Sequence, residues 1–187
     1  MPASAALVAS AGVRELVITA VGEDRPGIVA GLTGALLAVG ANLQDCRAAL
    51  LRGSFAMVMA VSLPDDVDPE GARAALAPVA LELGLGLWVG DAAPPPGAAA
   101  GERCVLSVYG ADHPGIVHAA ASALAARGAN IVDLSSRLVG DPPIFVLGVE
   151  ADLPAGLSPD DLADALRPLA EEQRVEVHLQ SESDEVL

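Results

Sequence analysis

The chain has 187 residues and carries 25 acidic side chains against 10 basic ones, so its formal net charge is −15. Every basic residue is an arginine, and the absence of lysine excludes Schiff-base chemistry and a P-loop. Binding to a nucleic acid backbone needs a basic face that releases counterions, and the arginines form no cluster, so direct nucleic acid binding is not expected.

The two cysteines, Cys46 and Cys104, lack C-x-x-C spacing, which argues against a zinc site and fits a reducing compartment. We predict that both are small buried apolar residues.

Residues 1–12 lack the basic start of a signal peptide, and Gly, Pro and charges interrupt each apolar run before about 18 residues. The expected location is the cytoplasm, without membrane contact.

An internal repeat sets the organisation of the chain. Residues 22–29 (Gly-Glu-Asp-Arg-Pro-Gly-Ile-Val) return as residues 110–117 (Gly-Ala-Asp-His-Pro-Gly-Ile-Val). Gly-Ala-Asn at residues 40–42 returns at the same spacing as residues 128–130. This pattern predicts a tandem duplication of one structural unit.

Each copy begins with a strand and a helix. The β-rich runs at residues 14–21 and 103–109 predict the first strand of each copy. Apolar residues with helical spacing follow each Pro-Gly and predict helices that end near residues 39 and 127. Each predicted helix is followed by a glycine suited to a C-terminal cap, namely Gly40 and Gly128.

Two strands joined by a hairpin come next. Alternation along residues 55–62 predicts the second strand of this pair, with a turn at Arg52-Gly53. The second copy has Asp141-Pro142-Pro143 in the matching loop, and a two-residue insertion there shifts the spacing of everything that follows. The length difference between the copies therefore falls in a loop, as expected for repeats.

A second helix and a last strand complete each copy. Asp68-Pro69 and Ser158-Pro159 each combine an N-cap residue with the proline favoured at the first helical position. Later in these helices, Pro78 and Pro168 predict a kink or an early end. The final strands are predicted from alternating residues at 85–89 and 175–179.

The order βαββαβ, present twice, predicts an α+β protein of two ferredoxin-like units, each an antiparallel four-stranded sheet with both helices on one face. The strands are apolar on both sides, so we expect the other unit or a second chain to cover the remaining sheet face. The expected division is an N-terminal extension (1–13), a first domain (14–90), an Ala/Pro/Gly linker (91–101), a second domain (102–180) and an acidic tail (181–187).

The loop between the first strand and first helix of each copy is the candidate binding site. Glycines permit close backbone approach, and the free amides of a helix N-terminus attract a carboxylate. Asp24 and Asp112 could receive an ammonium group, while Asn42 and Asn130 could supply an amide. This chemistry suits a free amino acid. The alternative interpretation is that both aspartates cap helices and both asparagines are turn residues.

The repeated Asp-x-Pro-Gly-Ile-Val and Gly-Ala-Asn resemble the ACT domain, a βαββαβ regulatory module that commonly binds amino acids where two modules meet. The resemblance covers residues 14–90 and 102–180. It implies that the ligand is contacted by Asp24, Asn42, Asp112 and Asn130. The neighbouring loop residues complete the candidate set: Arg25, Gly27, Ile28, His113, Gly115 and Ile116.

Two differences bear on the ligand. Serine-binding ACT modules often carry a His two residues before the position of Asp24, whereas this chain has Gly22 and Gly110 at the two such positions. This difference argues against serine as the ligand. The expected ligand is glycine or a similar small amino acid. Arg25 is replaced by His113 in the second copy, so the two loops need not share a ligand.

No nucleophile elbow, metal signature or phosphate loop is present, so we expect no catalysis, no cofactor and no metal. The resemblance implies a regulator of transcription that senses an amino acid, forms a homodimer and acts through a protein partner such as a transcriptional activator. The alternatives are a regulatory subunit of an amino-acid metabolic enzyme, or a fragment of an ACT-bearing enzyme such as formyltetrahydrofolate deformylase. The second alternative is disfavoured, because the two units leave no residues for a catalytic domain.

Three surface features leave more than one interpretation open. Trp88 is expected either in a subunit contact or buried in the core. His178, at the matching position of the second copy, is expected to be exposed. Asp45 and Arg47 follow Asn42 on an exposed strand pattern, which predicts either a salt-bridged surface or a partner contact.

Overall fold

The computed structural model describes residues 14–93 and 100–181. The expected N-terminal extension, residues 94–99 of the expected linker and residues 182–187 of the expected tail lie outside the described residues. The chain divides into two compact units. We call residues 14–93 the first unit and residues 100–181 the second unit.

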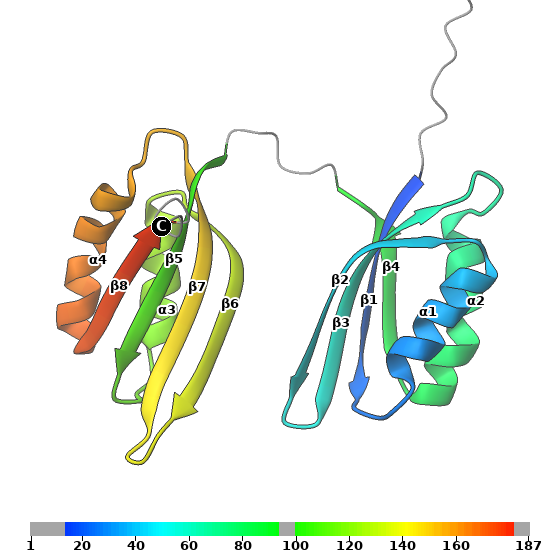
Figure 1. Ribbon diagram of the computed structural model, residues 1–187, viewed down its shortest axis with the longest axis horizontal. Helices are drawn as coiled ribbons and strands as arrows, with labels where there is room; N and C mark the ends of the chain where they lie inside the picture. Colours follow the sequence, from blue (N-terminus) through cyan, green and yellow to red (C-terminus); the bar gives the residue numbers. More distant parts are fainter. Residues whose placement is uncertain (1–13, 94–99, 182–187) are drawn as a thin grey trace, which may run out of the picture. The chain divides into compact units, whose positions relative to one another are not determined.

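Both units have the predicted order of elements (Figure 1). The first unit contains β1 (Arg14–Glu23), α1 (Ile28–Ala38), β2 (Asn42–Leu51), β3 (Ser54–Leu63), α2 (Pro69–Leu83) and β4 (Gly86–Asp91). The second unit contains β5 (Ala100–Gly110), α3 (Ile116–Ala126), β6 (Asn130–Val139), β7 (Ile144–Pro154), α4 (Pro159–Gln173) and β8 (Val175–Ser181).

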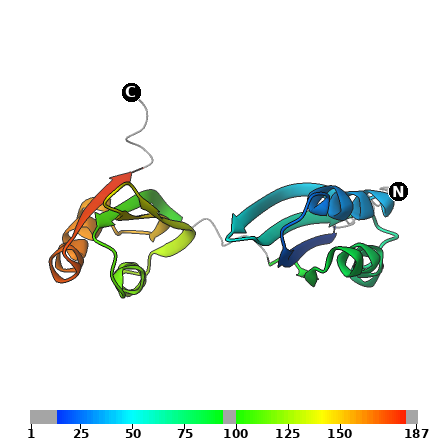
Figure 2. The ribbon, with the colours of Figure 1, turned by 90° about the horizontal axis from the view of Figure 1, so that it is seen from below.

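The two sheets are antiparallel and four-stranded, with the orders β2-β3-β1-β4 and β6-β7-β5-β8. In each unit both helices lie on the same face of the sheet (Figure 2). The prediction of two ferredoxin-like units in tandem is therefore confirmed. No helix in the described part of the chain combines the length and the apolar character needed to cross a membrane.

The core of each unit lies between its sheet and its helices. Along β1, the buried side chains of Leu16, Ile18 and Ala20 alternate with half-buried Val17 and Thr19 on the opposite face. Helix α1 contributes its buried residues Ile28, Leu32 and Leu36 to the same core. Full burial of such a side chain stabilises the fold by about 1.5–3 kcal/mol, so this stripe holds the helix on the sheet.

The two cores distribute side-chain volume in opposite ways. In the first unit two paired strand residues are large and the helix residue is small: Leu16, Val61 and Ala72. At the matching positions of the second unit the paired strand residues are small and the helix residue is large: Cys104, Ala151 and Leu162. All of these side chains are buried, so the exchange approximately conserves core volume.

The predicted turns and helix ends are confirmed. Arg52 and Gly53 have φ values of 49° and 83°, the positive values that a two-residue type I′ hairpin requires. Gly40 and Gly128 follow α1 and α3 with φ values of 73° and 72°. The inserted residues of the second unit lie in the loop between Val139 and Ile144.

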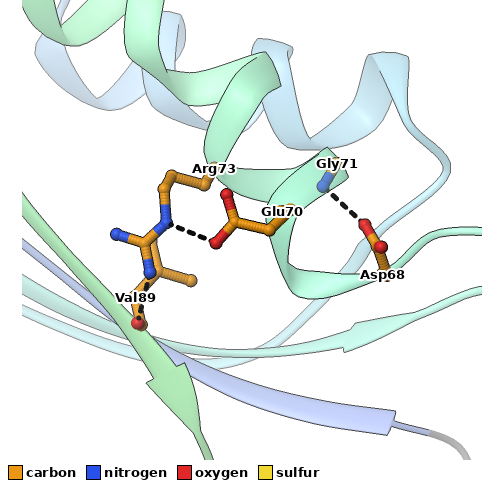
Figure 3. Close-up of polar contacts among 5 residues, drawn as sticks. All are labelled: Asp68, Glu70, Gly71, Arg73 and Val89. Carbon is orange, nitrogen blue, oxygen red and sulfur yellow. Dashed lines mark hydrogen bonds and ion pairs between the residues drawn. The ribbon is translucent and has the colours of Figure 1, made fainter.

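The predicted caps of the second helices are also present. Asp68 accepts a hydrogen bond from the Gly71 amide at 2.7 Å (Figure 3). The Ser158 hydroxyl accepts one from the Asp161 amide at 3.1 Å. Close to the first of these caps, Arg73 donates to the Val89 carbonyl at 3.1 Å and ties α2 to β4 (Figure 3).

The prediction of an early helix end at Pro78 and Pro168 is wrong, because α2 and α4 continue to Leu83 and Gln173. Both prolines are exposed. The carbonyl that each proline leaves without an intrahelical partner lies one turn back on the solvent side, where water satisfies it at little cost.

The prediction of two buried cysteines holds for Cys104, which is buried, and is wrong for Cys46, which is exposed. Cys46 lies on β2, an edge strand whose residues are all exposed. A buried position for Trp88 is likewise wrong, since 56% of this residue is accessible. His178 is exposed as predicted, and its ring meets that of Tyr109 edge-on.

Candidate functional site

The loops after β1 and β5 are built in the same way. In both, a glycine with positive φ precedes the helix and occupies the N-cap position, Gly27 at 97° and Gly115 at 108°. Among the described residues no side chain caps α1 or α3. The interpretation of Asp24 and Asp112 as helix caps is therefore wrong, because the intervening Pro-Gly places the N-cap three residues beyond each aspartate. The first amides of both helices remain available to a ligand.

Both aspartates are exposed in these loops. The Asp24 amide donates to the Gly53 carbonyl at 2.9 Å, which fastens the loop to the hairpin between β2 and β3. Ile28 and Ile116, by contrast, begin α1 and α3 and are buried. Of the candidate residues in each loop, the aspartate is thus exposed while the isoleucine anchors the helix in the core.

The two asparagines begin strands and lie at the other end of the sheet. Asn42 pairs with Ser62, which in turn pairs with Glu15 at the start of β1. Glu15 lies nine residues before Asp24, a separation of roughly 25 to 30 Å along an extended strand. Asn130 lies opposite Asp152 and Arg103 in the equivalent position. Within one unit, the aspartate and the asparagine are not brought together.

Gly22 and Gly110 are enclosed by the residues that directly follow the second helix of each unit. A Cβ at Gly22 would lie 2.7 Å from Leu85 Cδ2 and 2.9 Å from the Gly84 carbonyl oxygen. A Cβ at Gly110 would lie 2.7 Å from Val175 Cγ1. The positions where serine-binding modules carry a His therefore have no room for a side chain.

Arg25 lies beside the C-terminus of α2. Its Nη2 is 3.7 Å from Glu23 Oε2 and would be 3.9 Å from a Cβ at Gly84, the C-cap of this helix. A cation is stabilised at this end of a helix by the exposed carbonyls and the helix dipole. Arg25 thus brings a cation to the end of the second helix of its unit.

His113 makes the corresponding contact in the second unit. Its Nε2 is 2.8 Å from the carbonyl oxygen of Gln173, the last residue of α4, and its Nδ1 is 3.1 Å from the Pro114 carbonyl oxygen. Carbonyl oxygens only accept, so both nitrogens can donate together only in the protonated ring. The Gln173 carbonyl, then that of Pro114, raises the pKa of His113 above its usual 6.5, and Asp112 adds to this, while burial and Arg174 oppose it.

The contact between His113 and Gln173 is expected to weaken as the pH rises. Because the folded-state pKa is raised, the contribution of this contact to stability is complete below the unfolded pKa near 6.5 and is lost as the pH rises through the folded value. NMR titration of the His113 ring should give a midpoint above 6.5. The hydrogen-exchange protection factors in the first turn of α3, which correct for the intrinsic rise of exchange with pH, should fall on the alkaline side.

The substitution His113→Arg, which copies Arg25, should remove this pH dependence. The control His118→Gln alters an exposed histidine two residues into α3 and should preserve it. A His113 midpoint at or below 6.5 would contradict the assignment.

A hollow of about 550 Å³ opens beside the second loop. Gly110 and Ala111 of the loop line it, together with Tyr109 and residues from the end of α4 and the start of β8. Its charged lining residues are Glu171, Arg174 and Glu176. Sequence reasoning missed these three, because they follow the loop by some 60 residues and no local motif marks them. They supply both charge signs that an amino acid requires.

The fold defines this chain as a tandem βαββαβ protein, and residues 14–89 and 102–180 match the ACT domain family. The chain belongs to this family, which confirms the resemblance noted from the sequence.

A solved structure of an unknown protein from Galdieria sulphuraria is 32% identical, with a TM-score of 0.81, over 91% of this chain and 99% of that one. A solved structure of a candidate glycine cleavage system transcriptional repressor shares the fold with a TM-score of 0.66 and 21% identity, over 90% of this chain and 97% of that one.

Two curated relatives match shorter stretches. A UPF0237 protein of Methanopyrus kandleri is 43% identical over 74 residues, 39% of this chain and 82% of the relative. The glycine cleavage system transcriptional repressor of Escherichia coli is 47% identical over 47 residues, which is 25% of each chain. The chain is thus an ACT protein related to this repressor.

Proposed function

We propose that this protein is a non-catalytic cytoplasmic regulator that senses a small amino acid, glycine or a similar one, at its strand-helix loops. The observation that carries the proposal is the hollow lined by Gly110 and Ala111 of the second loop together with an arginine and two glutamates, Arg174, Glu171 and Glu176. The same loop leads to the uncapped start of α3. Membership of the ACT family supports an amino acid as the ligand.

The proposed contacts follow from charge. The free amides at Gly115 and Ile116 and the Arg174 guanidinium attract the carboxylate of the ligand. Asp112 and Glu171 attract its ammonium group. His113 anchors the loop to α4 and does not itself need to touch the ligand. In a single unit Asn130 lies too far away to take part.

The first unit offers a related loop with Asp24, Gly27 and Ile28 as the ligand contacts and Arg25 as the anchor. Its anchor is permanently charged, whereas that of the second unit titrates. The two loops need not bind the same amino acid. Asn42, like Asn130, lies outside the site that one unit forms.

The proposed output is a change in contact with a protein partner such as a transcriptional activator. The Escherichia coli relative is a transcriptional repressor, which supports this choice. The net charge of −15 disfavours direct contact with DNA. A ligand shifts such a contact only if it binds one arrangement more tightly, and about 1–3 kcal/mol of difference is enough. We also propose that the protein is a homodimer.

A thermal-shift screen of the twenty amino acids tests the sensor. A ligand at 100 times its Kd adds about 2.7 kcal/mol to the stability of the native state, so a cognate amino acid should raise the melting temperature clearly. The variants Asp112→Ala and Arg174→Gln should lose the shift that the second loop produces.

Asn130→Ala is the matched control, because this residue is exposed but lies at the far end of the same sheet. The proposal fails if no amino acid shifts the melting temperature and calorimetry detects no heat of binding for any of them.

A further inference from the structure

The sheet face that points away from the helices differs sharply between the two units. In the first unit this outer face is largely apolar, and the residues exposed on it include Val58 at 47% and Trp88 at 56%. At the positions matching Ala60 and Ser62, the second unit has Glu150 and Asp152. Exposed apolar patches of this kind mark interaction surfaces.

One row of residues across the outer face of the first unit has a bulky group at one edge and a cation at the other. Cross-strand pairing places Arg47 beside Val58, Val58 beside Thr19, and Thr19 beside Trp88. The Trp88 ring leans over Gly90, since a Cβ on that glycine would lie 2.5 Å from Cη2 of the ring.

The next row consists mainly of small side chains, which leave a hollow. It runs through Asp45, Ala60, Val17 and Gly90. A hollow of about 340 Å³ lies here, lined by Val17, Asp45, Arg47, Val58 and Ala60, with Cys46 and Met59. The face therefore carries a protruding ring near β4 and a depression near β2.

The strand order makes this face complementary to itself. The middle of the sheet lies between β3 and β1. A two-fold axis parallel to the strands and between two such faces sets β4 of one copy opposite β2 of the other. Trp88 and Arg47 lie in the same row. The Trp88 ring of each copy therefore meets the Arg47 guanidinium and the hollow of the other copy. A two-fold interface requires this kind of self-complementarity.

Charge favours the same face. A chain of net charge −15 repels its own copies, so self-association needs a surface where charges cancel. In the two rows of the first unit the charged residues are Asp45 and Arg47, one of each sign. An arginine stacked on a tryptophan also gains a cation–π interaction.

The second unit lacks these features. The row matching that of Trp88 consists of Ser135, Gly148, Ser107 and His178. Beside it, Asp133 pairs with Glu150, so two copies of this face would bring carboxylates together.

We propose that a second copy of this chain docks on the outer sheet face of the first unit, with Trp88 of each copy seated against Arg47 and the hollow of the other. This interface does not depend on amino acid binding.

Sedimentation velocity and fluorescence test the proposal on the full chain, because Trp88 is its single tryptophan. Between about 1 and 100 μM the wild type should convert from monomer to dimer, and the Trp88 emission should shift to shorter wavelength over the same range. The variants Trp88→Ala and Arg47→Glu should raise the dimer Kd at least about ten-fold.

His178→Ala, the matched change in the second unit, is the control and should leave the dimer Kd within about two-fold. Far-UV circular dichroism verifies the fold of each variant. If Trp88→Ala proves unstable, Arg47→Glu still tests the proposal, because Arg47 lies on an exposed edge strand. A wild type that stays monomeric at about 100 μM overturns the proposal, as do variants that dimerise as tightly as the wild type.

Discussion

Replacement of Leu16 with alanine is expected to lower the free energy of unfolding of the first unit by about 2–5 kcal/mol. Leu16 is fully buried in the core that also contains the small α2 residue Ala72, so the space it leaves is not readily filled. Urea unfolding followed by Trp88 fluorescence measures the change, because this residue lies on β4 of the same unit. Low protein concentration keeps association from contributing.

The core of the second unit indicates how the stability lost in Leu16→Ala can be restored. Adding Ala72→Leu to Leu16→Ala imitates the small strand residue and large helix residue found there, and should recover at least about half of the lost stability. The control Leu37→Ala makes the same change at a residue of α1 that is 76% exposed, and should cost less than about 0.5 kcal/mol. A loss equal to that of the control would show that Leu16 is not a core residue.

Gly22→Ala is expected to destabilise the first unit by about 1–3 kcal/mol, because the added Cβ overlaps Leu85 and approaches the Gly84 carbonyl oxygen. Leu85 can move, whereas the backbone carbonyl cannot move without shifting the end of α2. Gly22→His should therefore destabilise the fold without creating a serine site. Chemical denaturation and a serine titration measure the two effects.

Gly34→Ala is the matched control. Gly34 is an exposed glycine within α1, and a Cβ there meets nothing within 4 Å. The substitution should raise stability by up to about 1 kcal/mol through helix propensity. If Gly22→Ala were equally stabilising, the crowding at this loop would be absent in solution.

Much of the fold could be predicted because its signals are local. The glycines at 40 and 128, the turn at Arg52-Gly53 and the caps at Asp68 and Ser158 each act within a few residues. The β-bulges between Leu43 and Asp45, and between Ile131 and Asp133, could not be predicted, because they depend on pairing with a strand elsewhere in the chain.

The candidate site was predictable only in its loops. Asp24 and Asp112 lie in them as expected, but the separation of Asp24 from Asn42 follows from strand register, which motif spacing does not contain. Glu171 and Arg174 reach the second loop because β8 pairs with β5 and sets Val175 opposite Gly110, a contact distant in sequence. The motif Asp-x-Pro-Gly does not specify whether the aspartate or the glycine is the N-cap. The choice of Gly27 depends on the backbone geometry of the loop.

The opposite distribution of volume in the two cores has a consequence for folding. Tandem copies of one fold risk exchanging segments while the chain collapses. A sheet with Leu16 and Val61 covered by a helix with Leu162 would be overfilled, and a sheet with Cys104 and Ala151 covered by a helix with Ala72 would contain a void. Each mismatched product is expected to be less stable than the native pairing. The divergence of these few side chains would then favour the packing of each helix on its own sheet.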